Sequence, residues 1–147
     1  MSIKKILTKS EKQTHSLGKK LAKQLRGGEV LALTGQLGAG KTVLVKGIAA
    51  GLGIKKIITS PTFVLMKVYH LQPTTYNLPP TQLVHIDCYR TSSQQEIADI
   101  GAAEYFGRKD TITVIEWAEK IKKILPSQKI EIEIRLKRQN TREITIK

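Results

Sequence analysis

Eight consecutive residues, GQLGAGKT, constrain the fold of this chain more than any other segment. They fit the pattern of a phosphate-binding P-loop, in which a glycine is followed by a short variable stretch and then by Gly-Lys-Thr. Small residues let the backbone curl so that successive N–H groups face one concavity, where they can bind phosphate oxygens. The predicted nucleotide-binding residues are Gly35, Gln36, Leu37, Gly38, Ala39, Gly40, Lys41 and Thr42.

The residues on either side of the motif are those of a strand and a helix. EVLALT, at positions 29–34, has the apolar core of a buried strand. After the motif, apolar residues recur with helical spacing at Val45, Ile48, Ala49 and Leu52. The order of strand, loop and helix is the one that a P-loop requires, whereas an ordinary glycine-rich turn is the alternative.

Length and composition suit one compact unit. The chain has 147 residues, 40% of them hydrophobic, which predicts a single P-loop domain over residues 1–147. It contains neither an apolar run of about eighteen residues nor a secretory leader, so we expect a cytoplasmic protein without membrane contact. The one cysteine, Cys88, agrees with a reducing compartment and is predicted to be a buried apolar residue. A reactive thiol would need a histidine partner, and His85 would face the other way on a shared strand.

Periodicity and turn residues predict the remaining elements. A helix over residues 11–26 begins with a capping box formed by Ser10 and Gln13. At the C-terminus, apolar and charged residues alternate, which predicts an amphipathic antiparallel hairpin. The fold is therefore expected to be a three-layer α/β P-loop NTPase-like fold, with a mixed sheet and that hairpin. Between the two ends we expect strands over 55–59, 63–70, 82–90 and 111–117. The proline-rich residues 71–81 are expected to form a loop or a hairpin excursion, residues 94–106 one or two short helices, and residues 118–125 a helix.

The net charge of +13 is concentrated towards the two ends of the chain. On a helix over residues 11–26, basic residues gather on one face, opposite the leucines. This face is either a solvated surface or a docking surface for nucleic acid or an acidic protein, and charge alone does not separate these possibilities. Its members are Lys12, Lys19, Lys23 and Arg26.

A P-loop also needs a carboxylate for the Mg²⁺ shell and a group that orients the attacking water. Asp87 and Glu116 each end a predicted apolar strand, at the sheet edge where ligands bind in open α/β folds. Thr62, in the proline-containing turn SPTF, is a further candidate because such a threonine can close over the terminal phosphate. A capping or ion-pairing role for each carboxylate, and an ordinary turn for Thr62, are the structural alternatives.

These motifs occur together in an order that resembles one family. The blocks are GQLGAGKT, SPTF at 60–63, HIDCYR at 85–90, GAAEYF at 101–106 and VIEWAEK at 114–120. In order and spacing they resemble the TsaE (YjeE) family of small bacterial ATPases, over nearly the whole length of the chain.

The resemblance implies a cytosolic ATPase that takes part in threonylcarbamoylation of the adenosine next to the anticodon in tRNA. In the family, the acyl transfer belongs to TsaD, which is paired with TsaB. The TsaE component binds their complex, and its ATP hydrolysis resets that complex between turnovers. The resemblance thus implies ATP and Mg²⁺ as cofactors, and as partners TsaD-like and TsaB-like proteins together with tRNA, contacted directly or through the complex.

Carried over by position, the resemblance implies that Lys41, Thr62, Asp87 and Glu116 are catalytic. Thr42 is the expected direct Mg²⁺ ligand, and Glu116 and Asp87 compete for the carboxylate role. Trp117 follows Glu116 as in the family's Glu-Trp pair, with partner stacking, nucleotide sensing and plain packing all open.

The chain departs from the family's usual motif at two positions. Gln36 stands where the family usually has aspartate, and Val43 where a second threonine is common.

Two other functions also stay open at this point. A small phosphotransferase is disfavoured because only Arg90 and Arg108 lie between Thr42 and Ile115. An RNA-binding module regulated by nucleotide would use the basic helix face and the hairpin.

Overall fold

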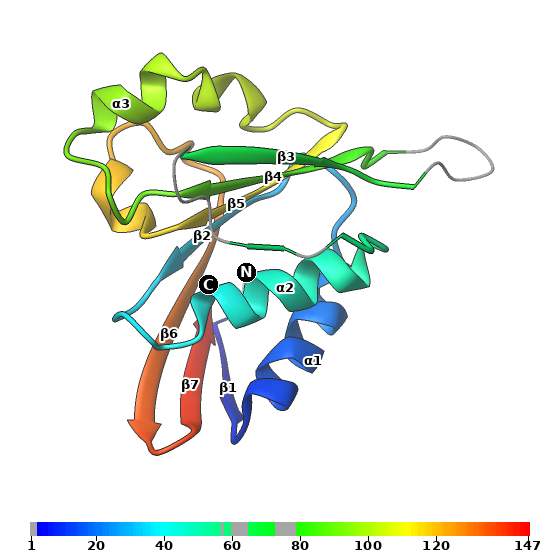
Figure 1. Cartoon of the computed structure of the whole chain (residues 1–147), viewed down its shortest axis with the longest axis vertical. Helices are drawn as coiled ribbons and strands as arrows, with labels where there is room; N and C mark the ends of the chain where they lie inside the picture. The colour runs from blue at the N-terminus through cyan, green and yellow to red at the C-terminus, as the bar shows by residue number, and fades with distance from the viewer. Residues whose placement is uncertain (1–2, 57, 60–64, 73–78) are drawn as a thin grey trace.

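The computed structural model describes residues 3–56, 58–59, 65–72 and 79–147. Its strands join into one mixed seven-stranded sheet in the order β1-β7-β6-β2-β5-β4-β3, with helices on both faces (Figure 1). This arrangement confirms the predicted three-layer α/β class. The elements in chain order are β1 (Lys4–Thr8), α1 (Glu11–Ala22), β2 (Val30–Thr34), α2 (Lys41–Gly51), β3 (Met66–His70), β4 (Gln82–Asp87), α3 (Gln94–Asp99), η1 (Ala102–Tyr105), β5 (Thr111–Glu116), η2 (Ala118–Ile121), β6 (Ile130–Arg138) and β7 (Thr141–Ile146).

The centre of the sheet is parallel and both edges are antiparallel. β2 pairs in parallel with β5 on one side and with β6 on the other, and β5 pairs in parallel with β4. β3 is antiparallel to β4, whereas β6, β7 and β1 form the antiparallel side, which includes the predicted C-terminal hairpin. The carboxyl ends of β2, β4 and β5 consequently meet at one edge, where open α/β sheets bind ligands.

Helices α1 and α2 cover one face of the sheet and pack closely on each other (Figure 1). A Cβ on Gly18 of α1 would lie 2.5 Å from the Leu44 carbonyl oxygen of α2, so the two backbones approach as only glycine allows. Leu44, Val45 and Ile48 are fully buried against the sheet. This packing fixes the start of α2 directly above the carboxyl edge of the sheet.

The opposite face is covered by α3, η1 and η2. Ile97, Ala102 and Ile121 from these elements pack with Val84, Ile86, Cys88 and Ile115 in a second buried cluster. Cys88 has no exposed surface, so the prediction of a buried thiol is confirmed. None of the described helices has the length and apolar character needed to cross a membrane.

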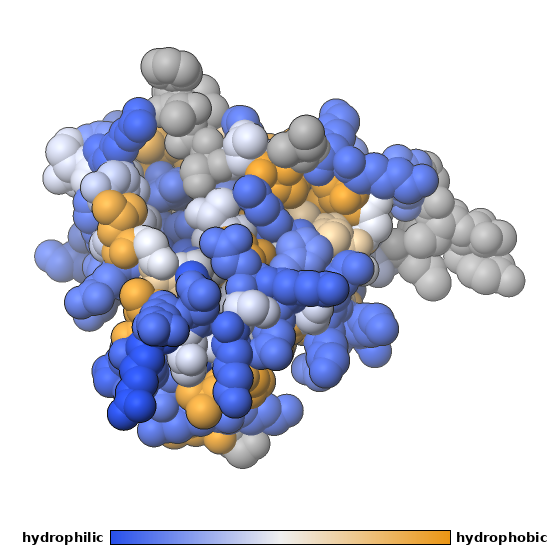
Figure 2. Space-filling model, turned by 60° about the horizontal axis from the view of Figure 1, so that its bottom comes forward, coloured by the Kyte–Doolittle hydropathy of each residue, from blue (hydrophilic) through white to orange (hydrophobic). Residues whose placement is uncertain are grey.

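The start of α1 agrees with the predicted cap. The Gln13 N–H donates to Ser10 Oγ at 3.1 Å, and Gln13 Oε1 accepts from the Lys9 N–H at 2.7 Å. The helix ends at Ala22, before the predicted end at residue 26. The predicted basic face, which comprises Lys12, Lys19, Lys23 and Arg26, is exposed. Figure 2 shows that hydrophilic residues cover most of the side of the molecule drawn there.

Three predicted or missed elements need correction. Residues 55–56 and 58–59 form no strand, because Ile58 fills the core from a loop without pairing its backbone in the sheet. Of the helix predicted over 118–125, only the 3-10 turn η2 forms, since so short a segment has little intrinsic helical stability. The strand β1 was not predicted, because its exposure pattern lacks a regular alternation and its place depends on pairing with β7.

The strand predicted over 63–70 corresponds in part to β3, which is Met66–His70; residues 63–64 lie outside the described residues. β3 and β4 pair antiparallel through His70 and Gln82, and the proline-rich residues 71–81 lie between these two strands in the sequence. Residues 73–78 of that segment lie outside the described residues.

Candidate functional site

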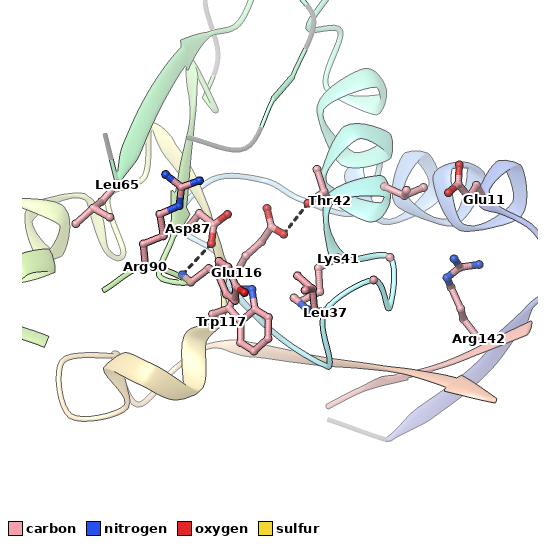
Figure 3. Close-up of a pocket in the computed structure, with 14 residues that line it drawn as sticks. Glu11, Leu37, Lys41, Thr42, Leu65, Asp87, Arg90, Glu116, Trp117 and Arg142 are labelled. Atoms are coloured by element: carbon pink, nitrogen blue, oxygen red, sulfur yellow. Dashed lines mark hydrogen bonds between the residues drawn. The ribbon is translucent and has the colours of Figure 1, made fainter. Parts of the chain in front are cut away.

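The candidate site lies where the carboxyl ends of β4 and β5 meet the start of α2. Asp87 and Glu116, the last residues of β4 and β5, are paired in register across the two strands. A cavity of about 350 Å³ opens beside them (Figure 3). It is lined by residues 37–38 and 40–43, together with Glu11, Leu65, Asp87, Tyr89, Arg90, Glu116, Trp117 and Arg142.

Residues 35–42, called the glycine-rich loop from here on, reach this cavity in a conformation that depends on glycine. Gly35, Gly38 and Gly40 have φ angles of 146°, 80° and 108°, which place them in the region where a side chain is strained. A Cβ on Gly38 would meet nothing within 4 Å, so the backbone there borders open space. Gly40 caps α2 without a side-chain hydrogen bond. The Gly40 cap therefore places no side chain over this end of α2, and the N-terminal end of a helix is where backbone N–H groups can bind an anion.

The side chain of Lys41 is folded back over its own loop. Its Nζ donates to the carbonyl oxygens of Gly35 at 2.6 Å and Gln36 at 2.8 Å, and lies 4.2 Å from the centre of the Trp117 ring. Burial lowers the pKa of the Lys41 ammonium, and the nearby Glu116 carboxylate opposes this shift. Lys41 is thus held at the cavity by contacts that a phosphate can replace.

Glu116 connects the glycine-rich loop to the interior of the sheet. Its Oε1 accepts a hydrogen bond from Thr42 Oγ1 at 2.9 Å (Figure 3). Its Oε2 lies 2.6 Å from Nε2 of His85, which is completely buried on β4. With Glu116 as a carboxylate, Nε2 is the donor of that bond. Both carboxylate oxygens of Glu116 are therefore fixed.

Asp87 lies beside Glu116 but is held differently. Its Oδ1 accepts from the Tyr89 N–H at 3.0 Å, and the residue is half-buried. Burial raises the pKa of the Asp87 carboxyl, although the hydrogen bond from Tyr89 opposes the shift. The two carboxylates at this edge are consequently held by different partners: Glu116 is bonded to Thr42 and His85, whereas Asp87 accepts a hydrogen bond from the Tyr89 N–H.

Two aromatic rings border the cavity beyond the carboxylates. Trp117 and Tyr89 have ring centres 5.1 Å apart, and Tyr89 is 45% exposed. The Trp117 backbone has a φ of 59°, an uncommon conformation for a non-glycine residue. Leu37, in the glycine-rich loop, also lines the cavity and is 72% exposed, so exposed apolar surface belongs to the cavity lining.

Comparison with known proteins identifies the family. Residues 8–144 match the family described as Threonylcarbamoyl adenosine biosynthesis protein TsaE. The chain belongs to the TsaE family. It is 40% identical to the tRNA threonylcarbamoyladenosine biosynthesis protein TsaE of Treponema pallidum, over 95% of this chain and 97% of that protein. It is 38% identical to the TsaE protein of Bacillus subtilis, over 94% of this chain and 81% of that protein.

A solved structure agrees with this assignment. The crystal structure of YdiB from Bacillus subtilis is similar with a TM-score of 0.78 and 34% sequence identity, over 99% of this chain and 84% of that one. The TsaE family assignment places the chain in tRNA threonylcarbamoyladenosine biosynthesis.

The structure places most of the predicted site residues of this TsaE chain together. Lys41, Thr42, Asp87 and Glu116 line one cavity, and Trp117 lies at its border. Gln36 is exposed, and its carbonyl oxygen accepts from Lys41. Thr62 lies outside the described residues, as does the rest of SPTF.

Two residues at the site were missed by sequence reasoning, which considered His85 only as a partner for Cys88. As predicted, the side chains of His85 and Cys88 lie on opposite faces of the sheet. The sequence did not indicate that the His85 side chain contacts Glu116. Strand alternation already places His85 on the same face as Asp87, and that signal could have found it. For Arg142, which lies in β7, no pattern in the sequence indicated a place in the site.

The donor set at the cavity fits Mg²⁺. Among the described residues, no group of three or more His, Cys, Asp or Glu side chains is arranged to hold a metal ion by itself. Mg²⁺ at a nucleotide site needs fewer protein ligands, because it takes hard oxygen atoms from one or two side chains and the rest from phosphates and water. The bonded pair of the Thr42 hydroxyl and Glu116 carboxylate supplies such oxygens.

Proposed function

We propose that this TsaE chain binds and hydrolyses ATP, and that hydrolysis drives its action on a complex of TsaD-like and TsaB-like proteins. The observation that carries the proposal is the convergence of three features on one cavity: the glycine-rich loop, the Lys41 ammonium and the bond from Thr42 to Glu116. The cavity of about 350 Å³ is within the size range of small-molecule sites.

The triphosphate would be bound by the glycine-rich loop and the start of α2. Backbone N–H groups of the loop and of the start of α2, which Gly40 caps without a side-chain hydrogen bond, would donate to phosphate oxygens. Lys41 would exchange its two carbonyl acceptors for phosphate oxygens, which compensate a buried ammonium better because they carry charge. This exchange would also separate Lys41 from Trp117, whose ring is now 4.2 Å away.

Mg²⁺ would be held by the Thr42 hydroxyl directly and by Glu116 directly or through water. When bound, Mg²⁺ neutralises charge on the terminal phosphates. Asp87 is suited to accept a proton from the attacking water, because it lines the cavity next to Glu116 and burial raises its pKa, which makes its carboxylate a better proton acceptor than an ordinary aspartate. Thr62 remains the proposed switch residue that closes over the terminal phosphate.

The acyl transfer to tRNA would belong to the partner proteins, and ATP hydrolysis by this chain would reset their complex in the cytoplasm after each turnover. Contact with tRNA would be made directly by the exposed basic residues of α1 or through the partner complex. A chain that works in this way should hydrolyse ATP slowly alone, since its full catalytic arrangement forms only with the partners.

The test is ATP hydrolysis by the purified chain, measured with and without a TsaD–TsaB pair. We expect slow turnover alone, stimulation by the pair, and loss of the stimulated rate in Lys41→Ala and Glu116→Gln. Lys46→Ala, which changes an exposed lysine of α2, is the matched control and should behave as wild type. Rapid hydrolysis that ignores the pair would refute the proposal. Consumption of ATP only with an added phosphate acceptor would identify a phosphotransferase instead.

A further inference from the structure

The basic face of α1 is a continuous row of exposed cations. Lys12, Lys19 and Lys23 follow one another at seven and four residues, a spacing that keeps them on one side of the helix. At 1.5 Å per residue, this row is about 16 Å long. Arg26 extends it beyond the end of the helix, where its Nη1 donates to the Lys23 carbonyl oxygen at 2.8 Å. Lys20, next to the row, is exposed as well.

Carboxylates of the protein offset only part of this charge. In the described part of the chain, no Asp or Glu oxygen lies within 4.0 Å of a cationic group of the basic face or of Lys20. Two carboxylates lie at its ends. Glu11 is in the first turn of α1 and lines the nucleotide cavity, whereas Glu29 accepts from the backbone N–H groups of Arg26 and Gly27. Five cations beside two carboxylates leave this surface positive, so mobile counterions must balance it until a polyanion binds.

The surface around the basic face has no apolar anchor. The exposed side chains of α1 are all polar, whereas Leu17 and Leu21 pack against the core. Protein interfaces concentrate aromatic and apolar side chains at their centre and are depleted in lysine. A helix that binds a membrane surface needs a free apolar face, and the apolar face of α1 is already used. A phosphate backbone needs neither feature, because lysine and arginine bind it through charge.

We propose that the basic face of α1 binds the phosphate backbone of tRNA directly. This inference rests on the proposed function, which leaves direct and indirect contact with tRNA open, and it names the surface that makes the contact. The family assignment to tRNA threonylcarbamoyladenosine biosynthesis selects tRNA among the polyanions that could bind there. Contacts to phosphates carry no base information, so this surface would position the tRNA, and sequence choice would belong to the partner proteins.

The test uses two lysines that lie far from the nucleotide cavity. Lys19 and Lys23 are about 12 and 18 Å along the helix from Glu11, the residue of α1 that lines the cavity. The double variant Lys19→Gln/Lys23→Gln removes two charges and keeps residues of similar helix propensity. Its matched control is Lys122→Gln/Lys123→Gln, which removes the same charge from exposed lysines at the end of η2, on the opposite face of the sheet.

The measurement is binding of a tRNA transcript to the isolated chain, without nucleotide or partner proteins, by fluorescence anisotropy at about 50 to 200 mM salt. Wild-type affinity should fall steeply as salt rises, because counterions compete for the phosphates. We expect Lys19→Gln/Lys23→Gln to bind about fivefold more weakly or worse. Its slope of log affinity against log salt should be smaller by about 1.5, since each phosphate contact contributes about 0.7–0.9. The control should keep the wild-type slope, and thermal melts should show that both variants are folded.

Several outcomes would overturn the inference. An equal loss in Lys122→Gln/Lys123→Gln would mean that net charge, and not this surface, attracts tRNA. Absence of tRNA binding by the wild-type chain at low salt would leave only contact through the partner complex. Unchanged tRNA affinity together with lost binding to the TsaD–TsaB pair would assign the surface to a protein partner. These results would leave the proposed ATPase standing, whereas failure of the chain to hydrolyse ATP would refute that function without affecting a tRNA assay that contains no nucleotide.

Discussion

His85 offers the sharpest test of how the site is built, because one buried hydrogen bond holds Glu116 in place. The side chains of His85 and Glu116 are 0% and 3% exposed, and the bond between them is 2.6 Å long. Replacing His85 with asparagine should break this bond, since the asparagine amide nitrogen lies where Nδ1 was and points away from Glu116. His85 Nδ1 has no partner in the described structure, so a donor at that position gains little.

The expected cost follows from the burial of Glu116. A hydrogen bond to a charged group contributes about 1.5–3 kcal/mol, and loss of one partner leaves the other buried and unsatisfied. We therefore expect His85→Asn to lower the free energy of unfolding by about 2–3 kcal/mol. For a chain of this length, that corresponds to a fall of about 4–10 °C in melting temperature.

His85→Gln is the matched control. The glutamine amide nitrogen occupies the place of Nε2 and can still donate to Glu116, so this variant should lose about 1 kcal/mol or less. Guanidinium unfolding without nucleotide measures both free energies, with the slopes compared to confirm similar exposure on unfolding. Equal stability of the asparagine and glutamine variants would refute the argument, because it would mean that the position of the donor is irrelevant. With the partner pair present, His85→Asn should also hydrolyse ATP more slowly than His85→Gln.

Two further predictions concern packing and the thiol. Gly47→Ala should lower the free energy of unfolding by about 2 kcal/mol, although alanine has the better helix propensity, because the new Cβ would overlap the His15 carbonyl oxygen. The control Lys46→Ala, in the same helix, should change the free energy of unfolding by about 0.5 kcal/mol or less. A Gly47→Ala variant as stable as wild type would contradict the packing of α1 on α2. Burial raises the pKa of the Cys88 thiol from 9.0 to about 12, so a thiol reagent at pH 8 should label Cys88 only in denaturant. The folded state keeps the Cys88 proton at a pH where the unfolded state releases it, so the contribution of Cys88 to stability is present below pH 9.0 and is lost as pH rises towards 12. Labelling of Cys88 in the native protein at the rate seen in denaturant would contradict the burial of the thiol.

The sequence predicted best the elements whose burial follows a period. The alternation in β6 and β7 and the apolar run of β2 correspond to strands whose side chains meet a core on one or both faces. β1 could not be predicted in this way, because its exposed side chains carry no such pattern and backbone pairing with β7 holds it. Ile58 is the opposite case: it belongs to a segment predicted as a strand, but it fills the core from a loop.

The residues of the candidate site likewise divide into those that the sequence predicted and those that it did not. The meeting of Asp87, Glu116 and the glycine-rich loop follows from parallel strands that end at one edge, a rule of open α/β sheets. The bond from His85 to Glu116 depends on the register between β4 and β5, which local pattern does not fix. Arg142 depends on the strand order, which brings β7 to the loop side of the molecule from the far end of the chain.

In the function that we propose, ATP bound in this cavity resets the partner complex during tRNA modification. The most direct measurement counts modified tRNA molecules per TsaD–TsaB complex in a reconstituted reaction, with the wild-type chain or with Lys41→Ala. We predict repeated turnover with the wild-type chain and about one modified tRNA per complex with Lys41→Ala, because a complex that is not reset stops after its first transfer. Repeated turnover with Lys41→Ala at the wild-type level would contradict the proposed role of ATP in resetting the complex.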